Sequence, residues 1–305
     1  MTCYKPLEAA RPTGSDQKPT IWKRGQRPKT LAPGWEPLAL PCGQCTGCRL
    51  ATRRNWATRM THEAQLHDEN SFITLTYDDD HLPTDGSLVK EHFQKFMKKL
   101  RKEIAPRRVR YFQCGEYGEN FQRPHYHACL FGYDFPDKKK YTRENEHDLY
   151  TSELLEKVWG KGYGIIGEVN YQSAGYVAGY INKKITGPSA SEHYCRDTTT
   201  GAIVQLQPEY ATMSRRPGLA AEWFDQFSDG VYPWDEVIIN GHPNKPPRYY
   251  DKLLERQDPV ELQRVKQQRA DNGAKYAHDN TPARLHQRHQ VAKAKLSLQK
   301  RNLEK

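Results

Sequence analysis

The sequence predicts an α+β protein built on an antiparallel sheet. Three runs, at 72–77, 109–115 and 125–131, have the alternating and β-branched or aromatic character of strands, because successive strand side chains point to opposite faces. A short polar loop separates the second run from the third, which favours a hairpin and therefore antiparallel pairing. Segments of helical periodicity lie between and after these runs, and we expect them to pack on one face of the sheet.

Composition favours a nucleic-acid partner. The 305 residues allow one large domain with extensions, or two domains. They include 47 basic and 37 acidic side chains, a net charge of +10, together with 18 Tyr, 9 Phe and 6 Trp. Positive charge with aromatic rings is typical of nucleic-acid binding, although a basic surface can simply keep a protein soluble. No apolar run approaches the about 20 residues that span a bilayer, and no signal segment opens the chain, so we expect neither membrane association nor secretion.

We expect three parts along the chain. Residues 1–48 are rich in Pro, Gly, Lys and Arg without apolar periodicity, which predicts an extended, partly mobile segment that ends in a cysteine cluster. Residues 49–240 form the main domain. Residues 241–305 are a linker and a basic tail. Within the tail, residues 252–305 carry 13 Lys and Arg against 6 Asp and Glu, which predicts a helical or partly disordered segment with salt-dependent DNA affinity.

The cysteine cluster indicates a metal site. Cys42, Cys45 and Cys48 form a C-x2-C-x2-C run, and the odd total of seven cysteines argues against a disulfide framework. Three thiolates suit Zn²⁺, which takes four ligands in structural sites. Cys3 is the best candidate for the fourth, since the metal would then fasten the N-terminal segment, and His62 is the alternative. An iron–sulfur cluster also fits the spacing, but the basic surroundings and the lack of a redox motif favour structural zinc.

The other elements of the main domain follow from apolar periodicity and capping signals. Ser152 is expected to cap a short helix. The Thr-x-Thr face of the first strand, Thr74 and Thr76, could line a site or belong to an ordinary strand. The sequence predicts helices at 49–67, 88–102, 152–159 and 173–184, a strand at 164–169, and a charged loop at 138–150.

The third strand carries a histidine pair. His125 and His127 share one face of this strand, and Tyr126 points to the other. Across the hairpin Glu116 would lie beside them, with Glu119 as a rival nearer the loop tip. Two imidazoles and a carboxylate suit Mg²⁺ or Mn²⁺ with open coordination positions. Taken alone, however, a His-x-His motif is more often a pair of ordinary strand histidines.

The helix at 173–184 carries a tyrosine pair. Tyr176 and Tyr180 are four apart and so lie on one helical face, with Lys183 following in the next turn. A phenol can attack a phosphodiester if a cation stabilises the phenolate and a metal polarises the phosphate. Packing of both rings on the core is the simpler interpretation. Gly175 and Gly179 make the helix slim, which would let a DNA backbone approach closely.

Three motifs occur in the order found in rolling-circle replication initiators, the HUH endonucleases. They are Phe72-Ile-Thr-Leu-Thr-Tyr77, Pro124-His-Tyr-His127 and Tyr176-x3-Tyr180-x2-Lys183. The chain resembles in particular the replication initiators of gokushovirus-type microviruses, which are small single-stranded DNA phages. This resemblance covers roughly residues 40–220 and departs at Tyr126, where the family motif has an aliphatic residue. Further segments that look like the family pattern are Cys42-Gly-Gln-Cys45-x2-Cys48, Gly115-Glu-Tyr-Gly118 and Ser214-Arg-Arg-Pro-Gly218.

The resemblance implies an HUH-type endonuclease domain and a strand-transfer reaction. His125, His127 and Glu116 would hold Mg²⁺ or Mn²⁺. One tyrosine would attack single-stranded or origin DNA, leaving a 5′-phosphotyrosine and a 3′-hydroxyl that primes a host polymerase working with a host helicase. A later 3′-hydroxyl would reverse the step and close the circle. Lys183 would orient the phosphate or steady the phenolate. The resemblance implies no small-molecule substrate, and the reaction would take place in the host-cell cytoplasm.

Two other interpretations stay open from the sequence. A relaxase or a single-strand transposase would use the same chemistry, and a zinc-bearing nucleic-acid-binding protein would use the histidines structurally. Basic side chains outside the motifs could contact DNA phosphates or simply be solvated. These candidates are Arg53, Arg54, Lys184, Arg215 and Arg216.

Overall fold

The chain contains two compact units. The computed structural model describes residues 3–15, 17–22, 25–118, 121–144, 147–181, 184–185, 187, 190–197 and 203–298. The smaller unit comprises Met1–Thr52 with Lys266–Lys300, and the larger comprises Arg53–Val265 with Arg301–Lys305. Their boundaries fall inside helices α1 (Thr46–Ala64) and α8 (Pro259–Lys275). The boundaries expected at 48/49 and 240/241 stay predictions about which parts fold independently.

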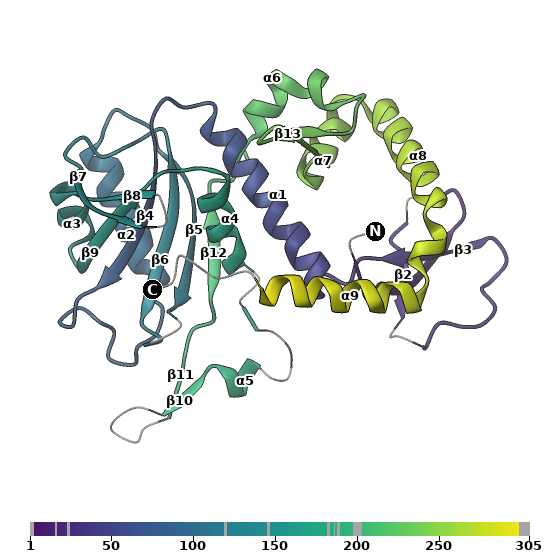
Figure 1. Cartoon of the computed structure of the whole chain (residues 1–305), viewed down its shortest axis with the longest axis horizontal. Helices are drawn as coiled ribbons and strands as arrows, with labels where there is room; N and C mark the ends of the chain where they lie inside the picture. The colour runs from purple at the N-terminus through teal and green to yellow at the C-terminus, as the bar shows by residue number, and fades with distance from the viewer. Residues whose placement is uncertain are drawn as a thin grey trace. The chain divides into compact units, whose positions relative to one another are not determined.

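A seven-stranded antiparallel sheet organises the larger unit (Figure 1). Its strand order is β12-β5-β6-β4-β9-β8-β7, so β6 and β4 lie near the middle. The three predicted strands and the α+β class are confirmed. The strands are β4 (Asn70–Tyr77), β5 (Arg110–Tyr117), β6 (Pro124–Phe131), β7 (Lys139–Glu144), β8 (His147–Thr151), β9 (Gly162–Gly167) and β12 (Tyr210–Met213).

The prediction of a loop at 138–150 was wrong, because β7 and β8 form a hairpin at the sheet edge. Charges that lower the strand propensity of each segment are complementary across the pair. Lys140 Nζ lies 2.8 Å and Arg143 Nε 3.8 Å from Asp148 Oδ1. Opposite charges on paired strands stabilise a hairpin that has few apolar residues.

Helices cover both faces of the sheet, which corrects the expectation of helices on one face. On one side α2 (Lys90–Glu103) and α3 (Glu153–Trp159) form a buried cluster with β4 and β6. On the other side α1 and α4 (Tyr171–Tyr180) form a second cluster with β5 and β6. Seven of the eight residues in β6 are buried, so this strand is apolar on both faces and requires a helical layer on each.

Tyr126 explains how an aromatic residue fits between the two histidines. Its side chain is fully buried in the cluster beneath α2. The hydroxyl donates to the Val89 carbonyl at 2.9 Å, accepts from the Val89 N–H at 3.0 Å, and lies 2.8 Å from the Tyr77 hydroxyl. A buried phenol is tolerated because its polar tip is satisfied. Since side chains alternate, the rings of His125 and His127 lie on the opposite face.

Capping residues fix where α3 and α4 begin. Ser152 caps α3 as predicted, accepting from the Leu155 N–H at 3.0 Å. Asn170 caps α4 by accepting from the N–H groups of Gln172 and Ser173, each at 2.9 Å. The Asn170 N–H in turn donates to the Ser173 hydroxyl at 2.9 Å. This capping box holds the start of the helix that carries the tyrosine pair.

The N-terminal segment is not merely extended, and that prediction was wrong. Strands β1 (Leu7–Pro12), β2 (Thr20–Trp22) and β3 (Trp35–Leu40) form a sheet of order β2-β1-β3. β1 pairs with β3 along its whole length, from Leu7 opposite Leu40 to Pro12 opposite Trp35. The structure therefore comes from backbone pairing between segments too short and too Pro-rich to show periodicity.

The C-terminal segment is helical, as one of the two predicted forms required. It contains α8, the 3-10 helix η1 (Ala277–Asn280) and α9 (Pro282–Ser297). Among the described helices none is long and apolar enough to cross a membrane. The remaining elements are α5 (Ala190–His193), α6 (Ala221–Val231), α7 (Arg248–Gln257), β10 (Cys195–Asp197), β11 (Ile203–Gln205), β13 (Val237–Ile239) and β14 (His242–Asn244).

Gly162 provides a test of the central sheet. It adopts φ +131°, and a Cβ there would lie 2.3 Å from the Asp78 nitrogen and 2.5 Å from the Thr76 oxygen. Gly162→Ala should therefore lower the free energy of unfolding by about 3 kcal/mol or more, measured by denaturant titration. Gly230→Ala is the matched control, since it lies in α6 with no atom within 4 Å of its Cβ position. It should be neutral or stabilising by up to ~1 kcal/mol. Equal effects of the two changes would contradict the account.

Candidate functional site

Strand pairing brings the predicted ligands together on one face of the sheet. In the β5–β6 pair Glu116 lies directly opposite His125, as the predicted hairpin requires. On the other side of β6, Thr74 lies opposite His127 and Thr76 opposite His125. The two histidines are thus flanked by a carboxylate from one neighbouring strand and by hydroxyls from the other.

His127 is held at both ring nitrogens. Its Nε2 lies 3.1 Å from Glu116 Oε1, and its Nδ1 lies 2.9 Å from the Thr74 hydroxyl. His127 is 6% exposed and Glu116 is 3% exposed. Polar groups in so dry a setting are rigidly oriented, because breaking either contact would leave a buried polar atom unsatisfied.

His125 has a less satisfied environment. Burial, and then the neighbouring charge of His127, lower the pKa of His125. Among the described residues its buried Nδ1 has no hydrogen-bond partner. A Cβ at Gly118 would lie 3.0 Å from His125 Cε1, so the glycine makes room for this ring. Sequence reasoning missed this role, although Gly118 lies in the Gly-Glu-Tyr-Gly segment that resembles the family pattern.

Helix α4 places both tyrosines against His127. The Tyr180 ring stacks on the imidazole with centroids 5.2 Å apart, and the Tyr176 ring meets it edge-on at 5.3 Å. The two phenol rings are themselves 4.9 Å apart. Tyr180 is 3% exposed, while Tyr176 is only partly buried. Core packing and proximity to the histidines therefore hold together, and the phenols lie where a phosphate bound at the histidines could be attacked.

The glycine face of α4 is not open to DNA, which corrects that expectation. Arg53 from α1 lies against it and donates from Nε to the Gly175 carbonyl at 2.7 Å. The nearest atoms to Cβ positions on Gly175 and Gly179 belong to Arg53. The glycines therefore allow close packing of α4 against α1.

The predicted DNA contacts are dispersed over the larger unit. Arg53 is exposed apart from its contact with α4, and Arg54 is partly buried. Lys184, Arg215 and Arg216 are exposed. These assignments stay predictions. Two further residues of the expected site, Lys183 and the rival ligand Glu119, lie outside the described residues.

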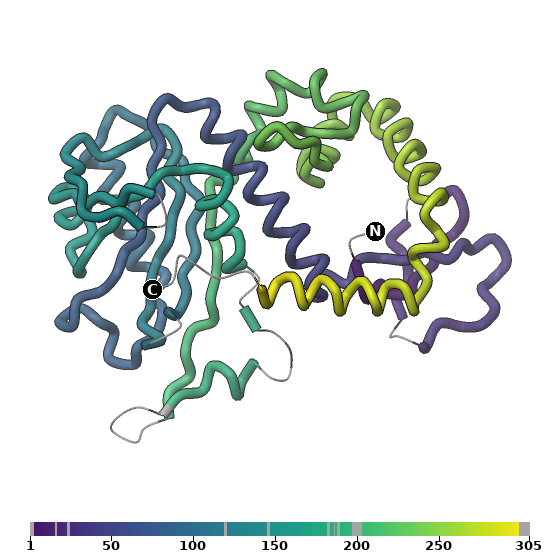
Figure 2. The backbone as a smooth tube through the Cα atoms, in the orientation of Figure 1, coloured from purple at the N-terminus to yellow at the C-terminus, as the bar shows by residue number. Residues whose placement is uncertain are grey.

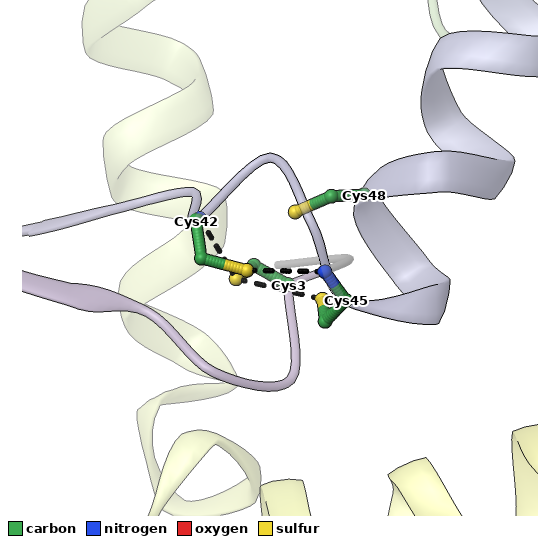
Figure 3. Close-up of side chains that lie close together, drawn as sticks. All are labelled: Cys3, Cys42, Cys45 and Cys48. Atoms are coloured by element: carbon green, nitrogen blue, oxygen red, sulfur yellow. Dashed lines mark hydrogen bonds between the residues drawn. The ribbon is translucent and has the colours of Figure 1, made fainter. Parts of the chain in front are cut away.

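The four predicted cysteines form a compact group in the smaller unit (Figure 3). Cys42 and Cys45 come from one loop, Cys48 from the first turn of α1, and Cys3 from the N-terminal segment. Their sulfur atoms all lie within 4.8 Å of one another. This is the arrangement needed to hold one metal ion, and Cys3 is its fourth member. The alternative, His62, instead lies 2.6 Å from the Tyr250 hydroxyl.

Hydrogen bonds at the sulfur atoms favour thiolates. The N–H groups of Cys42, Cys45 and Tyr4 donate to the sulfurs of Cys3, Cys42 and Cys45, each at 3.3 Å. Although burial opposes it, backbone donors at Cys48 and Tyr4 lower the pKa of Cys45 to about 6. Burial raises the pKa of Cys48. Several thiolates this close repel one another unless a cation binds between them.

The two groups differ in how closely their donor atoms approach. In the described part of the chain the cysteines are the one group of three or more potential ligands whose donor atoms all meet the 4.8 Å separation. His125, His127 and Glu116 do not, and the two imidazole centroids are 6.4 Å apart. A cation shared by the histidines and Glu116 would therefore require side-chain rotation.

Comparison with known proteins identifies the class. Residues 70–185, which contain the histidine and tyrosine pairs, match the family model for the replication-associated protein ORF2 group. The chain is 33% identical over 246 residues to replication-associated protein ORF2 of Spiroplasma virus 4, covering 76% of this chain and 73% of that protein. It is 31% identical over 268 residues to replication-associated protein VP4 of Bdellovibrio phage phiMH2K, covering 85% of this chain and 79% of that protein.

A third relative is replication-associated protein ORF4 of Chlamydia phage 1, at 30% identity over 228 residues, 70% of this chain and 53% of that protein. No solved structure matches the chain. The protein is thus replication-associated. It belongs to the family of replication-associated proteins of gokushovirus-type microviruses, which confirms the resemblance seen in its motifs.

The cysteine group makes a prediction about metal content. Purified protein should carry one zinc ion per chain, and Cys48→Ser should abolish this because a closed thiolate site needs all four ligands. Metal analysis of protein purified without added zinc measures the stoichiometry. Cys195→Ser is the control, since Cys195 is exposed and lies outside the group. Retention of zinc by the Cys48 variant would disprove the assignment.

Proposed function

We propose that this protein is an HUH endonuclease that initiates rolling-circle replication of phage DNA in the host-cell cytoplasm. The observation that carries the proposal is the contact of both α4 tyrosines with His127 at 5.2 and 5.3 Å, beside Glu116 and His125. Family membership supports the replication role. The seven-stranded antiparallel sheet, with the histidines on a central strand, is compatible with an HUH-type domain.

The ligand set suits Mg²⁺ or Mn²⁺. His125 Nδ1 is buried without a hydrogen-bond partner among the described residues, and a cation would satisfy it. His127 Nε2 and Glu116 Oε1 face each other at 3.1 Å, so each could turn its contact toward a shared ion. When bound, the ion would polarise a phosphate oxygen and offset negative charge in the transition state.

The protein's own groups perform the covalent step. A phenol oxygen of Tyr176 or Tyr180 attacks the scissile phosphorus, and the bond from phosphorus to the 3′-oxygen breaks. The products are a 5′-phosphotyrosine and a 3′-hydroxyl, with the phenol proton balancing the proton gained by the leaving oxygen. Lys183 is proposed to steady the phenolate or orient the phosphate. The 3′-hydroxyl is then available to a host polymerase, assisted by a host helicase.

Two tyrosines permit a second cleavage while the first DNA end is still attached. Their rings are 4.9 Å apart, so both can reach a phosphate held at the same histidines. A free 3′-hydroxyl that attacks the phosphotyrosine reverses the first step and joins the ends. The phosphodiester energy is conserved in the protein–DNA bond, so no nucleotide cofactor is required for rejoining.

The cysteine group is proposed to hold structural zinc. Its four sulfurs leave no position for a substrate on a tetrahedral ion, which distinguishes it from a catalytic centre. Zinc would fasten Cys3 to the loop that precedes α1 and so hold the strand that follows Cys3 in place. This accounts for order in a segment with few apolar residues.

Covalent capture of DNA tests the nuclease. Wild-type protein with Mn²⁺ and single-stranded origin DNA should give an adduct that survives denaturing electrophoresis, because the phosphotyrosine is covalent. The Tyr176→Phe/Tyr180→Phe variant should give none. Tyr163→Phe is the control, since that tyrosine is 62% exposed on β9. An adduct from the double variant would sink the tyrosine assignment, and no adduct from wild type would favour a non-catalytic zinc-bearing nucleic-acid-binding protein.

Thr74 gives a sharper test of the histidine site. Thr74→Val removes the hydroxyl 2.9 Å from His127 Nδ1 while keeping the side-chain shape. We expect about 10- to 100-fold less adduct at limiting Mn²⁺, because groups that orient a ligand histidine contribute that much to affinity or activity. High Mn²⁺ should partly restore the yield. Thr76→Val, at the neighbouring position opposite His125, is the control. Equal losses in both variants would show a general sheet defect.

A further inference from the structure

Positive charge is concentrated in the smaller unit. Its two segments, 1–52 and 266–300, contain 16 Lys and Arg but only 5 Asp and Glu, a net charge of +11. The larger unit, with its terminal residues, contains 31 basic and 32 acidic side chains, a net charge of −1. The part that carries the histidine and tyrosine pairs is therefore nearly neutral, and cannot by itself supply strong long-range attraction to phosphate.

The cysteine group belongs to this basic unit. Segments from both ends of the chain meet beside it, and Figure 2 shows the N-terminal trace next to the yellow C-terminal helix. The contact is made by His289 of α9, which is 6% exposed. The Tyr4 ring stacks on the His289 ring with centroids 5.1 Å apart and an interplanar angle of 20°. Thr46 Oγ1 lies 3.4 Å from His289 Nε2.

Both contacts to His289 come from residues next to cysteine ligands. Tyr4 follows Cys3, and its N–H donates to Cys45 Sγ at 3.3 Å. Thr46 follows Cys45 and begins α1. Gathering the four sulfurs thus also positions the two groups that hold α9, so the position of this helix depends on the metal site.

The outer surface of α9 is basic. The helix contains no Asp or Glu, and Leu285 and His289 form its buried stripe. Arg284 and Arg288 pair with Asp279 at 2.8 and 3.0 Å. Lys293 and Lys295 are exposed and form no ion pair with any carboxylate among the described residues. Their charges are available to an external anion.

We infer that the smaller unit is a metal-organised DNA-binding module that holds the phosphate backbone without sequence preference, with α9 as one of its contact surfaces. The inference rests on the proposed function, because it assigns to this unit the affinity that keeps DNA at the neutral nuclease unit. A polyanion with regularly spaced phosphates fits an exposed lysine pair on a helix better than a discrete small anion does.

Equilibrium binding of full-length, zinc-loaded protein to a homopolymeric thymidine strand tests the inference. Lys293→Glu/Lys295→Glu should weaken binding about tenfold at moderate salt, and the salt dependence should fall by about 1.4 log units per log unit, since each single-strand phosphate contact contributes ~0.7. Lys98→Glu/Lys99→Glu is the matched control, because these lysines are exposed on α2 of the larger unit. It should leave the salt dependence unchanged.

The metal link is tested by hydrogen exchange of α9. His289→Ala should retain its zinc but lose amide protection in α9 and weaken DNA binding, and zinc removal from wild type should do the same. Protection of α9 that is indifferent to zinc and to His289→Ala would overturn the link. Equal losses from the α9 and α2 charge reversals, or none from either, would overturn the DNA surface.

Failure of the nuclease proposal is read separately. The Tyr176→Phe/Tyr180→Phe variant should bind the thymidine strand like wild type, because its charges are unchanged. Full binding by this variant together with persistent adduct formation would refute the tyrosine assignment and leave the binding module intact.

Discussion

The site depends on the register of β5 against β6. Pairing Glu116 with His125 also places Thr74 beside His127 across β4, so one set of backbone hydrogen bonds delivers the carboxylate, both imidazoles and the hydroxyl to a single face. A slip of one residue would turn His125 and His127 into the other core and bring Tyr126 to the site. That slip is opposed by the buried Tyr126 hydroxyl and its contacts with Val89.

The two helical layers divide the work of this sheet. The layer of α2 and α3 buries an apolar face and fixes the register, whereas α1 and α4 cover the face that carries the histidines. Because α4 packs closely on α1 through its glycines, its tyrosines are directed toward the sheet and meet His127. Stability and placement of the phenols therefore come from the same contacts.

Much of this arrangement could be predicted from residue patterns. Alternation placed His125 and His127 together, the short loop placed Glu116 beside them, and the cysteine spacing with Cys3 anticipated the sulfur group. Three features could not be read in this way. The hairpin at 139–151 depends on cross-strand charge pairs, the N-terminal sheet on backbone pairing of distant segments, and the contact of His289 with Tyr4 on residues at opposite ends of the chain.

The most direct measurement is the identity of the residue bonded to DNA. Protein reacted with origin DNA and Mn²⁺ would be digested with nuclease and trypsin, and the nucleotide-bearing peptide sequenced by mass spectrometry. The account predicts a nucleotide on Tyr176 or Tyr180 within the tryptic peptide 162–183, which also contains Tyr163 and Tyr171 as internal controls. A nucleotide on either control tyrosine, or on a peptide outside α4, would contradict it.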